Sequence, residues 1–399
     1  MANREIYLDH AATTYVRQEA LDAMIPCMTE IYGNPSSLHS IGQKAKKALE
    51  DARASIAASL HARPEEIFFT SGGTESDNWA LRGVAAAKGG KGRHIITSKI
   101  EHPAVLHTAE ELEKSGFRVT YLDVDADGVV SLDQLKEALT PETILVSIMA
   151  ANNEIGTIQP IEEIGRMVKA NSGAVFHVDA VQAVGAIEVN LEKWKEVDLL
   201  SLSGHKFYGP KGVGVLYIRK GTRIGAVVTG GSQERKKRAG TENVPGAAGL
   251  AIALELDVAE MPVESARLIE LREHLIDRVL TEIGGARLNG HRTNRLPNNA
   301  NFAFDYIEGE SLLMMMNARG VAASTGSACS SASLEPSHVL LAIGLPHETA
   351  HGSFRISMGR ATTKEDIDYT VEALKSVVRT LQEMSPLYDE TKGAGCHVQ

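Results

Sequence analysis

The segment from Ser203 to Lys206 places a lysine beside a hydroxyl and an imidazole. It reads Ser203-Gly204-His205-Lys206 and follows a run typical of a strand. A lysine near a buried site can have a lowered pKa and can form a Schiff base with a carbonyl compound. Ser203 and His205 could hydrogen-bond a phosphate oxygen. The structural alternative is a surface lysine in a glycine-rich loop.

Residues 70–76, with the sequence TSGGTES, have the composition of a phosphate-binding turn. They follow a predicted strand and open a predicted helix. The two glycines let the backbone approach a ligand closely, and free N–H groups at a helix start favour a phosphate. The segment lacks both the lysine of a Walker motif and the G-x-G-x-x-G spacing. Taken alone, it fits a plain strand-to-helix turn capped by Thr74 better.

Asp179 ends an apolar run and precedes Lys206 by 27 positions. A buried carboxylate needs a cationic partner, and a protonated pyridine nitrogen is one. When that nitrogen stays protonated, a cofactor that contains the pyridine ring is a better electron sink. An N-cap aspartate for the next helix is the simpler reading. The order of phosphate turn, acid and lysine is therefore more informative than any of the three alone.

Cys329 lies in a small, polar, glycine-containing run, residues 323–336, which predicts a mobile loop. Most free cysteines are small core residues, but a loop of serines offers little core. An exposed thiol can become a thiolate and attack sulfur. A basic run, residues 235–238, is either an anion site or a solvated loop.

Strands and helices must alternate to position these residues. Expected strands cover residues 66–70, 94–97, 118–124, 143–149, 174–178, 198–202 and 213–218, and expected helices cover 75–87 and 104–115. This alternation indicates an α/β fold with a mostly parallel sheet flanked by helices. Ligands bind beyond the carboxyl ends of such strands, where the candidate residues lie. The pattern changes near residue 245, with a helix over 245–260 and then a smaller α+β domain.

Composition excludes several classes of function. The chain has 399 residues, 43% of them apolar, and a net charge of -10, which argues against nucleic acid as the main partner. No apolar run reaches the ~20 residues of a membrane helix, and no secretory segment is evident. Three widely spaced cysteines predict neither a disulfide framework nor a zinc cluster, so we expect a cytoplasmic protein.

The motifs together resemble fold-type I pyridoxal phosphate enzymes of the class V aminotransferase group. With Cys329 included, the chain is similar to cysteine desulfurases of the NifS/IscS type, from about residue 7 to 387, and its long cysteine loop matches group I. The resemblance implies a large domain, residues 14–258, with a mostly parallel seven-stranded sheet. Residues 1–13 and 259–385 would form the smaller α+β domain with the Cys329 loop, and 386–399 a flexible tail.

The resemblance also implies which residues contact the cofactor. They are Gly73, Thr74, His102, Asn153, Asp179, Gln182, Ser203, His205, Lys206 and Thr241. The cofactor phosphate would be bound by 73–74, Ser203 and His205, with Thr241 coming from the second subunit of a homodimer. Asn153 and Gln182 would lie near the 3′-oxygen of the cofactor.

The implied reaction removes sulfur from L-cysteine. Lys206 would hold the cofactor and remove the α-proton, while His102 would stack on the ring and move protons. Arg355, assisted by Asn34, would bind the substrate carboxylate. Cys329 would attack the substrate sulfur, which leaves L-alanine and a persulfide.

The persulfide would pass to a sulfur acceptor or an iron–sulfur scaffold protein. Cys329 is also the one expected metal ligand, as a transient iron–sulfur ligand. The chain departs from longer group I members in its last residues, where Cys396 and His397 are a weak metal signal. An aminotransferase, a lyase acting on selenocysteine or cysteine sulfinate, and a non-catalytic scaffold on the same fold are the alternatives.

Overall fold

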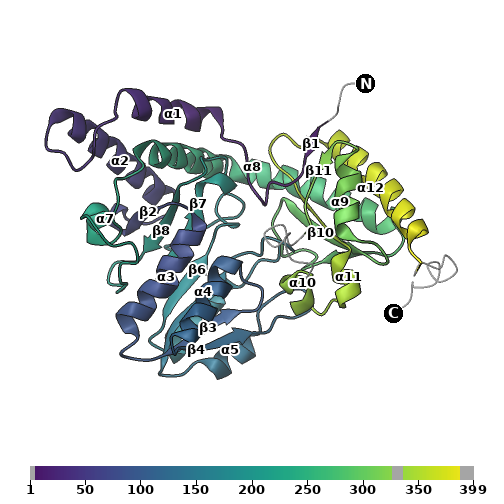
Figure 1. The fold of residues 1–399 in the computed structure, drawn as a ribbon, viewed down its shortest axis with the longest axis horizontal. Helices are drawn as coiled ribbons and strands as arrows, with labels where there is room; N and C mark the ends of the chain where they lie inside the picture. The colour runs from purple at the N-terminus through teal and green to yellow at the C-terminus, as the bar shows by residue number, and fades with distance from the viewer. Residues whose placement is uncertain (1–4, 326–335, 387–399) are drawn as a thin grey trace.

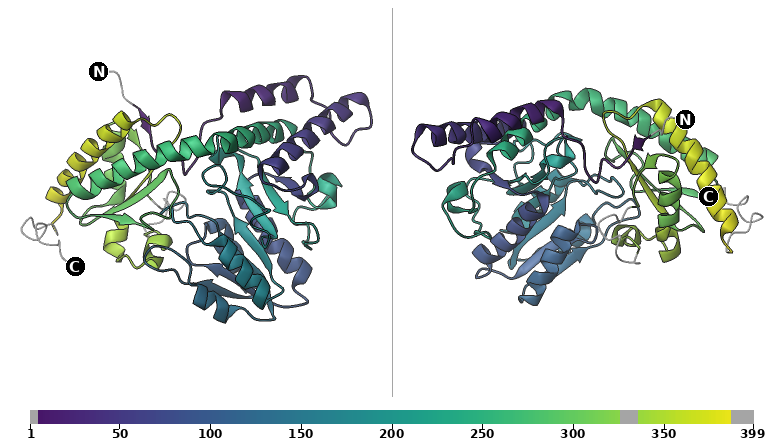
Figure 2. Two further views of the ribbon diagram at one scale, coloured as in Figure 1. Left: turned by 180° about the vertical axis from the view of Figure 1, so that it is seen from behind. Right: turned by 45° about the horizontal axis from the view of Figure 1, so that its top comes forward.

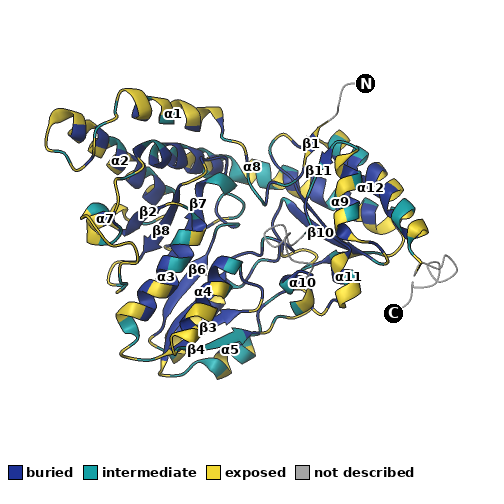
Figure 3. Ribbon diagram, viewed as in Figure 1, coloured by how far each residue is buried: buried dark blue, intermediate teal, exposed yellow. Residues whose placement is uncertain are grey.

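The computed structural model describes residues 5–325 and 336–386. Within these residues a large α/β layer lies beside a smaller α+β region, and one long helix runs along both (Figures 1 and 2). Buried positions concentrate on the strands and on the inner faces of the helices that cover them (Figure 3).

The large sheet has seven strands in the order β2-β8-β7-β6-β5-β3-β4. Their bounds are β2 Ile67–Thr70, β3 His94–Ser98, β4 Arg118–Leu122, β5 Thr143–Met149, β6 Val175–Asp179, β7 Leu199–Ser203 and β8 Gly214–Ile218. Strands β3 to β7 are parallel, and β8 is antiparallel to both β7 and β2. Strand β2 therefore runs in the direction of β7, and six strands end at one edge. The expected mostly parallel seven-stranded sheet, with its last strand turning back, is confirmed.

Helices cover both faces of this sheet. The helices of this region are α1 Gln18–Thr29, which packs on α8 (Val244–Glu282), α2 Ser40–Ser59, α3 Gly73–Lys88, α4 Pro103–Lys114, α5 Leu132–Ala138, α6 Ile161–Asn171 and the short, irregular α7 Gln233–Lys236. On β6, Phe176 and Val178 pack in the core shared with α2, α6 and α8, whereas Val175 packs in the core under α3 and α4. Because side chains alternate along a strand, His177 and Asp179 face α3 as Val175 does.

The smaller region is built on an antiparallel sheet with the order β12-β10-β9. Its strands are β9 Ala286–Asn289, β10 Asn299–Phe304 and β12 Ser353–Ser357, and a separate parallel pair joins β1 Ile6–Tyr7 to β11 Val321–Ala322. Its helices are α9 Gly309–Asn317, α10 His338–Ala342, α11 His347–His351 and α12 Lys364–Met384. The expected smaller α+β region is present.

Helix α8, Val244–Glu282, is continuous over 39 residues. The prediction of a helix over 245–260 was too short, because Pro262 lies inside α8 instead of ending it. Leu254 packs in the core of the large sheet and Leu275 in the core of the smaller one. Each half of the helix is therefore stabilised by its own core, and α8 crosses residue 258 without a break. Among the described residues, no helix combines the length and apolar character that crossing a membrane requires.

Candidate active site

The strand ends at one edge of the large sheet bring most of the candidate residues together. Residues 71–74 follow β2, and Asp179 ends β6. Ser203 ends β7 and leads into a short 3-10 turn, Gly204–Lys206. His102 is the N-cap of α4, shortly after β3. This is the edge at which parallel α/β sheets bind ligands.

Lys206 is held by two main-chain carbonyls. Its Nζ donates to the oxygens of Ala11 and Ala12 at 2.6 and 2.8 Å. The Nε2 of Gln182 donates to the same Ala11 oxygen at 2.9 Å. The lysine and the glutamine, predicted from distant segments, therefore meet at one carbonyl.

The phosphate turn lines a cavity of about 370 Å³. The lining residues are Thr13, Ser71, Gly72, Gly73, Thr74, Glu75, Ser203, His205, Lys211 and Gly212. Helix α3 begins here with Gly72 as N-cap and without a side-chain cap, so its first N–H groups lack a side-chain acceptor. A Cβ on Gly73 would lie 2.6 Å from Cγ2 of Val181, which explains the glycine. Backbone donors, hydroxyls and a lysine at a helix start fit a phosphate group.

Asp179 provides the acid at the other end of the site. It is buried, and this burial raises its pKa to about 6 despite a hydrogen bond from the Val181 N–H and the positive charge of Lys206. A desolvated carboxylate in this state is stabilised by a cation, and a protonated pyridine nitrogen is a suitable one. The phosphate cavity, Lys206 and Asp179 thus fit the three polar ends of pyridoxal phosphate.

His102 is neutral near pH 7. Burial, and then the nearby positive charge of Lys206, lower its pKa to about 4. Its Nδ1 accepts the N–H of Ala104 at 3.1 Å, so the ring proton lies on Nε2. This tautomer leaves Nε2–H as the ring group that can exchange a proton within the site.

Arg355 lies on β12, where the smaller region meets the site. Its two terminal nitrogens donate to the Asn153 carbonyl at 3.0 Å and to Oδ1 of Asp9 at 2.9 Å. Its Nε is buried and has no hydrogen-bond partner among residues 5–325 and 336–386. Ser324 and Arg355 exchange two backbone hydrogen bonds. Residue 324 is thus placed beside Arg355, while Cys329 lies outside the described residues.

Comparison with known proteins places this geometry in a family. The family model for class V aminotransferases matches residues 6–370. The chain belongs to this family. It is 57% identical to "Cysteine desulfurase IscS" of Methanosarcina thermophila over 96% of this chain and 95% of that protein. It is 55% identical to the protein of the same name from Clostridium botulinum (strain Hall), over 97% and 98%.

The solved structure of a "NIFS-LIKE PROTEIN" is similar to this class V chain, with a TM-score of 0.89 and 42% identity. It covers 94% of this chain and 100% of that one. The expected family resemblance is confirmed. Enzymes of this kind depend on pyridoxal phosphate, in agreement with the fit of the site.

Two predicted site residues are not brought to the others. Asn34 is exposed on the connection between α1 and α2, far from β10, the strand that pairs with β12 (Figure 1). Thr241 is exposed between α7 and α8. Within the described part of the chain, neither side chain hydrogen-bonds to the Lys206 cluster, so their roles stay predictions.

Sequence reasoning missed several contributors to the site. The carbonyls of Ala11 and Ala12 have no side-chain signal, since any residue supplies a carbonyl. Asp9 was not predicted as a site residue, although an acid near the chain start could have been paired with Arg355. Lys211 follows Lys206 by five residues in the same glycine-rich loop, and this spacing was the available signal.

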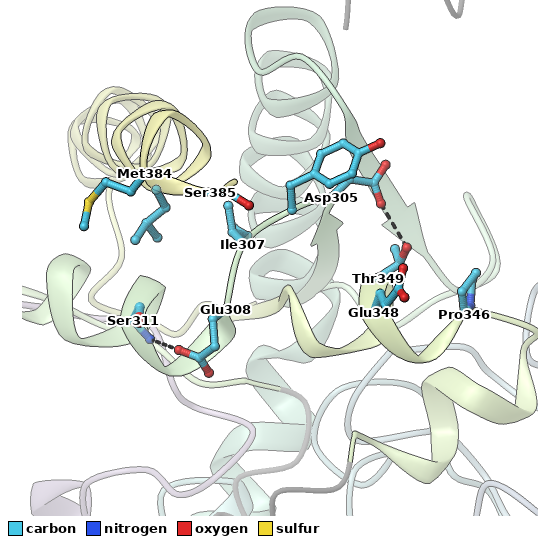
Figure 4. A pocket seen from close by; sticks show the side chains of 11 residues that line it. Asp305, Ile307, Glu308, Ser311, Pro346, Glu348, Thr349, Met384 and Ser385 are labelled. Carbon is cyan, nitrogen blue, oxygen red and sulfur yellow. Dashed lines mark hydrogen bonds between the residues drawn. The ribbon is translucent and has the colours of Figure 1, made fainter. Parts of the chain in front are cut away.

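A larger hollow of about 490 Å³ lies elsewhere, between the end of β10, the start of α11 and the end of α12 (Figure 4). There Asp305 accepts a hydrogen bond from Thr349, and Glu308 accepts one from the Ser311 N–H. It contains none of the predicted site residues. The described residues include no group of three or more His, Cys, Asp or Glu side chains placed to hold a metal ion.

Proposed function

We propose that the cluster around Lys206 performs the cysteine desulfurase reaction and that Cys329 receives the sulfur. The reaction class, a pyridoxal phosphate-dependent cysteine desulfurase, follows from the family and from relatives of that name at 55–57% identity over nearly the full length. The observation that supports the residue assignment is the convergence of Lys206, Asp179 and the phosphate cavity at one edge of the sheet.

The cofactor would be held at three points. The turn 72–74, with Ser203 and His205, would bind the phosphate, and Asp179 would face the ring nitrogen. Lys206 would hold the carbonyl carbon, with Gln182 and Asn153 near the 3′-oxygen. When bound, pyridoxal phosphate supplies an electron sink for the bonds of the substrate α-carbon.

Lys206 is proposed as the base at that carbon. The Ala11 and Ala12 carbonyls would keep the Lys206 Nζ beside the site whenever this amino group is not bonded to the cofactor. A free amine near a second cation or in a desolvated pocket is a competent base near neutral pH. His102, neutral and protonated on Nε2, would move a proton to or from the sulfur groups.

The proposed sulfur transfer takes place between the substrate thiol and the Cys329 thiol. The Cys329 thiolate attacks the substrate sulfur, the carbon–sulfur bond breaks, and its electron pair stays on the substrate carbon, which is then protonated. The sum is L-cysteine and a Cys329 thiol giving L-alanine and a Cys329 persulfide, without an external oxidant. Arg355, whose buried Nε has no partner among the residues that the structure describes, would bind the substrate carboxylate with the help of Asn34.

We also propose a homodimer. Large apolar side chains are exposed along α1, α2 and their connection, and Leu38 is 94% exposed. The others there are Leu21, Ile25, Met28, Tyr32 and Ile41. An exposed apolar surface of this kind fits an interface between protein chains, and a second subunit would give the exposed Thr241 a phosphate to bind. Light scattering on the purified protein checks this: a monomer at micromolar concentration would contradict it.

The finer assignments belong to the same proposal. The division into residues 14–258 and residues 1–13 with 259–385 stays a prediction, and the tail lies outside the described residues from 387 onward. An iron–sulfur scaffold as sulfur acceptor, a cytoplasmic location and a transient metal-ligand role of Cys329 are likewise proposed.

Substitution of single cysteines tests the assignment. Cys329→Ala should abolish L-alanine formation from L-cysteine while the visible absorption of the lysine-bound cofactor stays unchanged. Cys27→Ala and Cys396→Ala are the matched controls and should keep the activity. Full desulfurase activity in Cys329→Ala would contradict the persulfide step, and steady transamination of L-cysteine by the wild type would favour the aminotransferase alternative.

A further inference from the structure

The phosphate cavity contains a carboxylate. Glu75 lies in the first turn of α3 and lines the cavity together with residues 71–74. Its side chain is only 18% exposed, so water screens its charge weakly. A carboxylate beside a phosphate dianion would repel it unless another group neutralised the carboxylate.

Arg238 is that group. Its Nε and Nη2 donate to the two oxygens of Glu75 at 2.8 and 3.0 Å, which is a two-point charge-assisted contact. Oε2 of Glu75 also accepts the N–H of Ser71 at 2.8 Å. Burial raises the pKa of Glu75, but the hydrogen bonds from Arg238 and Ser71 outweigh it and hold the pKa below its usual value. The glutamate is therefore ionised, and its charge is offset.

The segment that carries Arg238 is hydrogen-bonded to β2, the strand that leads into the phosphate turn. Glu234 is buried, pairs with Arg53 at 2.8 and 2.9 Å, and accepts the N–H of Phe69 at 3.0 Å. Arg235 donates to the Ile67 carbonyl at 2.5 Å.

The backbone of this segment is strained. Residues 234, 235 and 236 all have positive φ, of 43°, 57° and 65°, which costs energy for residues other than glycine. Contacts to β2 on one side and Arg238 on the other keep the segment in this conformation. Of the two alternatives for the basic run, an anion site or a solvated loop, Arg238 fits the first, and the anion that it binds is Glu75.

We propose that Arg238 is a positioning residue for the cofactor phosphate: it neutralises Glu75 and fixes Glu75 on the Ser71 N–H, so that the turn 71–74 accepts a dianion. This inference rests on the proposed function, since it concerns the phosphate of the same site. The segment continues to Thr241, so the ion pair also links the phosphate turn of one subunit to the residue proposed to serve the other.

Phosphate binding to the cofactor-free full chain tests the proposal without use of the reaction. Inorganic phosphate and pyridoxal phosphate are titrated by calorimetry into wild type, Arg238→Gln, Glu75→Gln and the double variant. Arg238→Gln should weaken phosphate binding about tenfold, because it leaves the Glu75 charge uncompensated. Glu75→Gln should bind phosphate at least as tightly as wild type, and the double variant should recover to within about threefold.

A merely structural ion pair would give a different pattern. Both single variants would then weaken binding equally, and the double variant would not recover, which would overturn the proposal. The loss in Arg238→Gln should also shrink as salt rises, because screening reduces charge repulsion. Arg82 is exposed on α3, the helix that carries Glu75, so Arg82→Gln is the matched control and should bind phosphate as wild type does.

Two outcomes stay separate from the proposed function. If Arg238→Gln fails to fold, Glu75→Gln still decides, because a tenfold loss in that variant would overturn the charge argument. If wild type binds pyridoxal phosphate with the expected variant pattern but makes no L-alanine from L-cysteine, the proposed function fails and the ion-pair role stands.

Discussion

The two ends of the site, at Asp179 and at residues 71–74, differ in how their charged side chains are stabilised. The end at Asp179 lies beneath α3, among buried side chains of β5, β6 and β7. The end at residues 71–74 is a partly open cavity in which Arg238 and Glu75 compensate each other. One end relies on desolvation and the other on hydrogen bonds and paired charges.

The buried end places His177 and a second acid, Asp77, beside Asp179. His177 is held between Ser147 and Ser201 at 2.8 and 2.9 Å, and burial lowers its pKa to about 3. Asp77 is buried on α3, and burial, then the charge of Asp179, raise its pKa well above the usual value. The His177 ring is thus neutral near pH 7, and burial favours the protonated form of Asp77, whose Oδ1 lies 3.6 Å from the His177 Nε2 atom.

This difference assigns separate tasks to the two ends. A lone carboxylate in a desolvated setting acts strongly on a nearby cation, so the Asp179 end should control the rate. Hydrogen bonds to a phosphate act on the bound cofactor whatever its chemical state, so the cavity end should control affinity.

Lys206→Ala removes the group that both ends position. We expect L-alanine formation to fall by about 10³-fold or more, because the base at the α-carbon is lost. The visible band of the lysine-bound cofactor should disappear as well. Lys211→Ala, which changes a lysine of the cavity end, should keep the band and lower affinity only; loss of the band there instead would contradict the assignment of Lys206.

Asp179→Asn should separate rate from affinity. With the cofactor saturating, kcat should fall by about 10² to 10⁴, because a neutral amide does not keep the ring nitrogen protonated. The Kd for pyridoxal phosphate should change much less. Steady-state kinetics measure kcat, and cofactor titration measures the Kd. An unchanged kcat with weak cofactor binding would contradict the account, because the Asp179 end would then control affinity instead of rate.

Ser203→Ala should show the opposite pattern. Loss of one hydrogen bond to a charged phosphate should raise the Kd for pyridoxal phosphate about tenfold or more. The kcat at saturating cofactor should stay close to that of wild type. A large fall in kcat without a change in Kd would show that the cavity end also controls the rate.

The sequence predicted the strand ends well but not the contacts made by main-chain atoms. Lys206, Asp179 and residues 71–74 are recognisable because each residue type follows an apolar run. The Ala11 and Ala12 carbonyls that hold Lys206 leave no such pattern, since their partner lies nearly 200 positions away. The length of α8 was missed because Pro262 suggested a break that packing on two cores overrides.

Asp77→Asn should give the smallest effect, seen in stability. The pKa of Asp77 is raised in the folded chain above its unfolded value of about 4, so folding favours the protonated form. The contribution of protonated Asp77 to the free energy of unfolding is fully present below about pH 4. It is lost as the pH rises through the pKa of Asp77 in the folded chain. An asparagine has no proton to lose, so the melting temperature of the variant should rise relative to wild type between pH 5 and 8.

The exposed Asp133 on α5 provides the control for that series. Asp133→Asn removes an exposed carboxylate and should not raise the melting temperature as pH rises. If Asp77→Asn lowered the melting temperature, and more so at higher pH, Asp77 would be an anion paired with a charged His177, and the buried end would contain more than one charge.

The most direct test of the central claim is to locate the sulfur after a single turnover. The enzyme with bound pyridoxal phosphate is mixed with less than one equivalent of L-cysteine, alkylated and digested, and its cysteine peptides are compared by mass spectrometry. The account predicts one L-alanine per persulfide, with the extra sulfur on the peptide that contains Cys329. Sulfur on the Cys27 or Cys396 peptide, or L-alanine without any protein-bound sulfur, would contradict it.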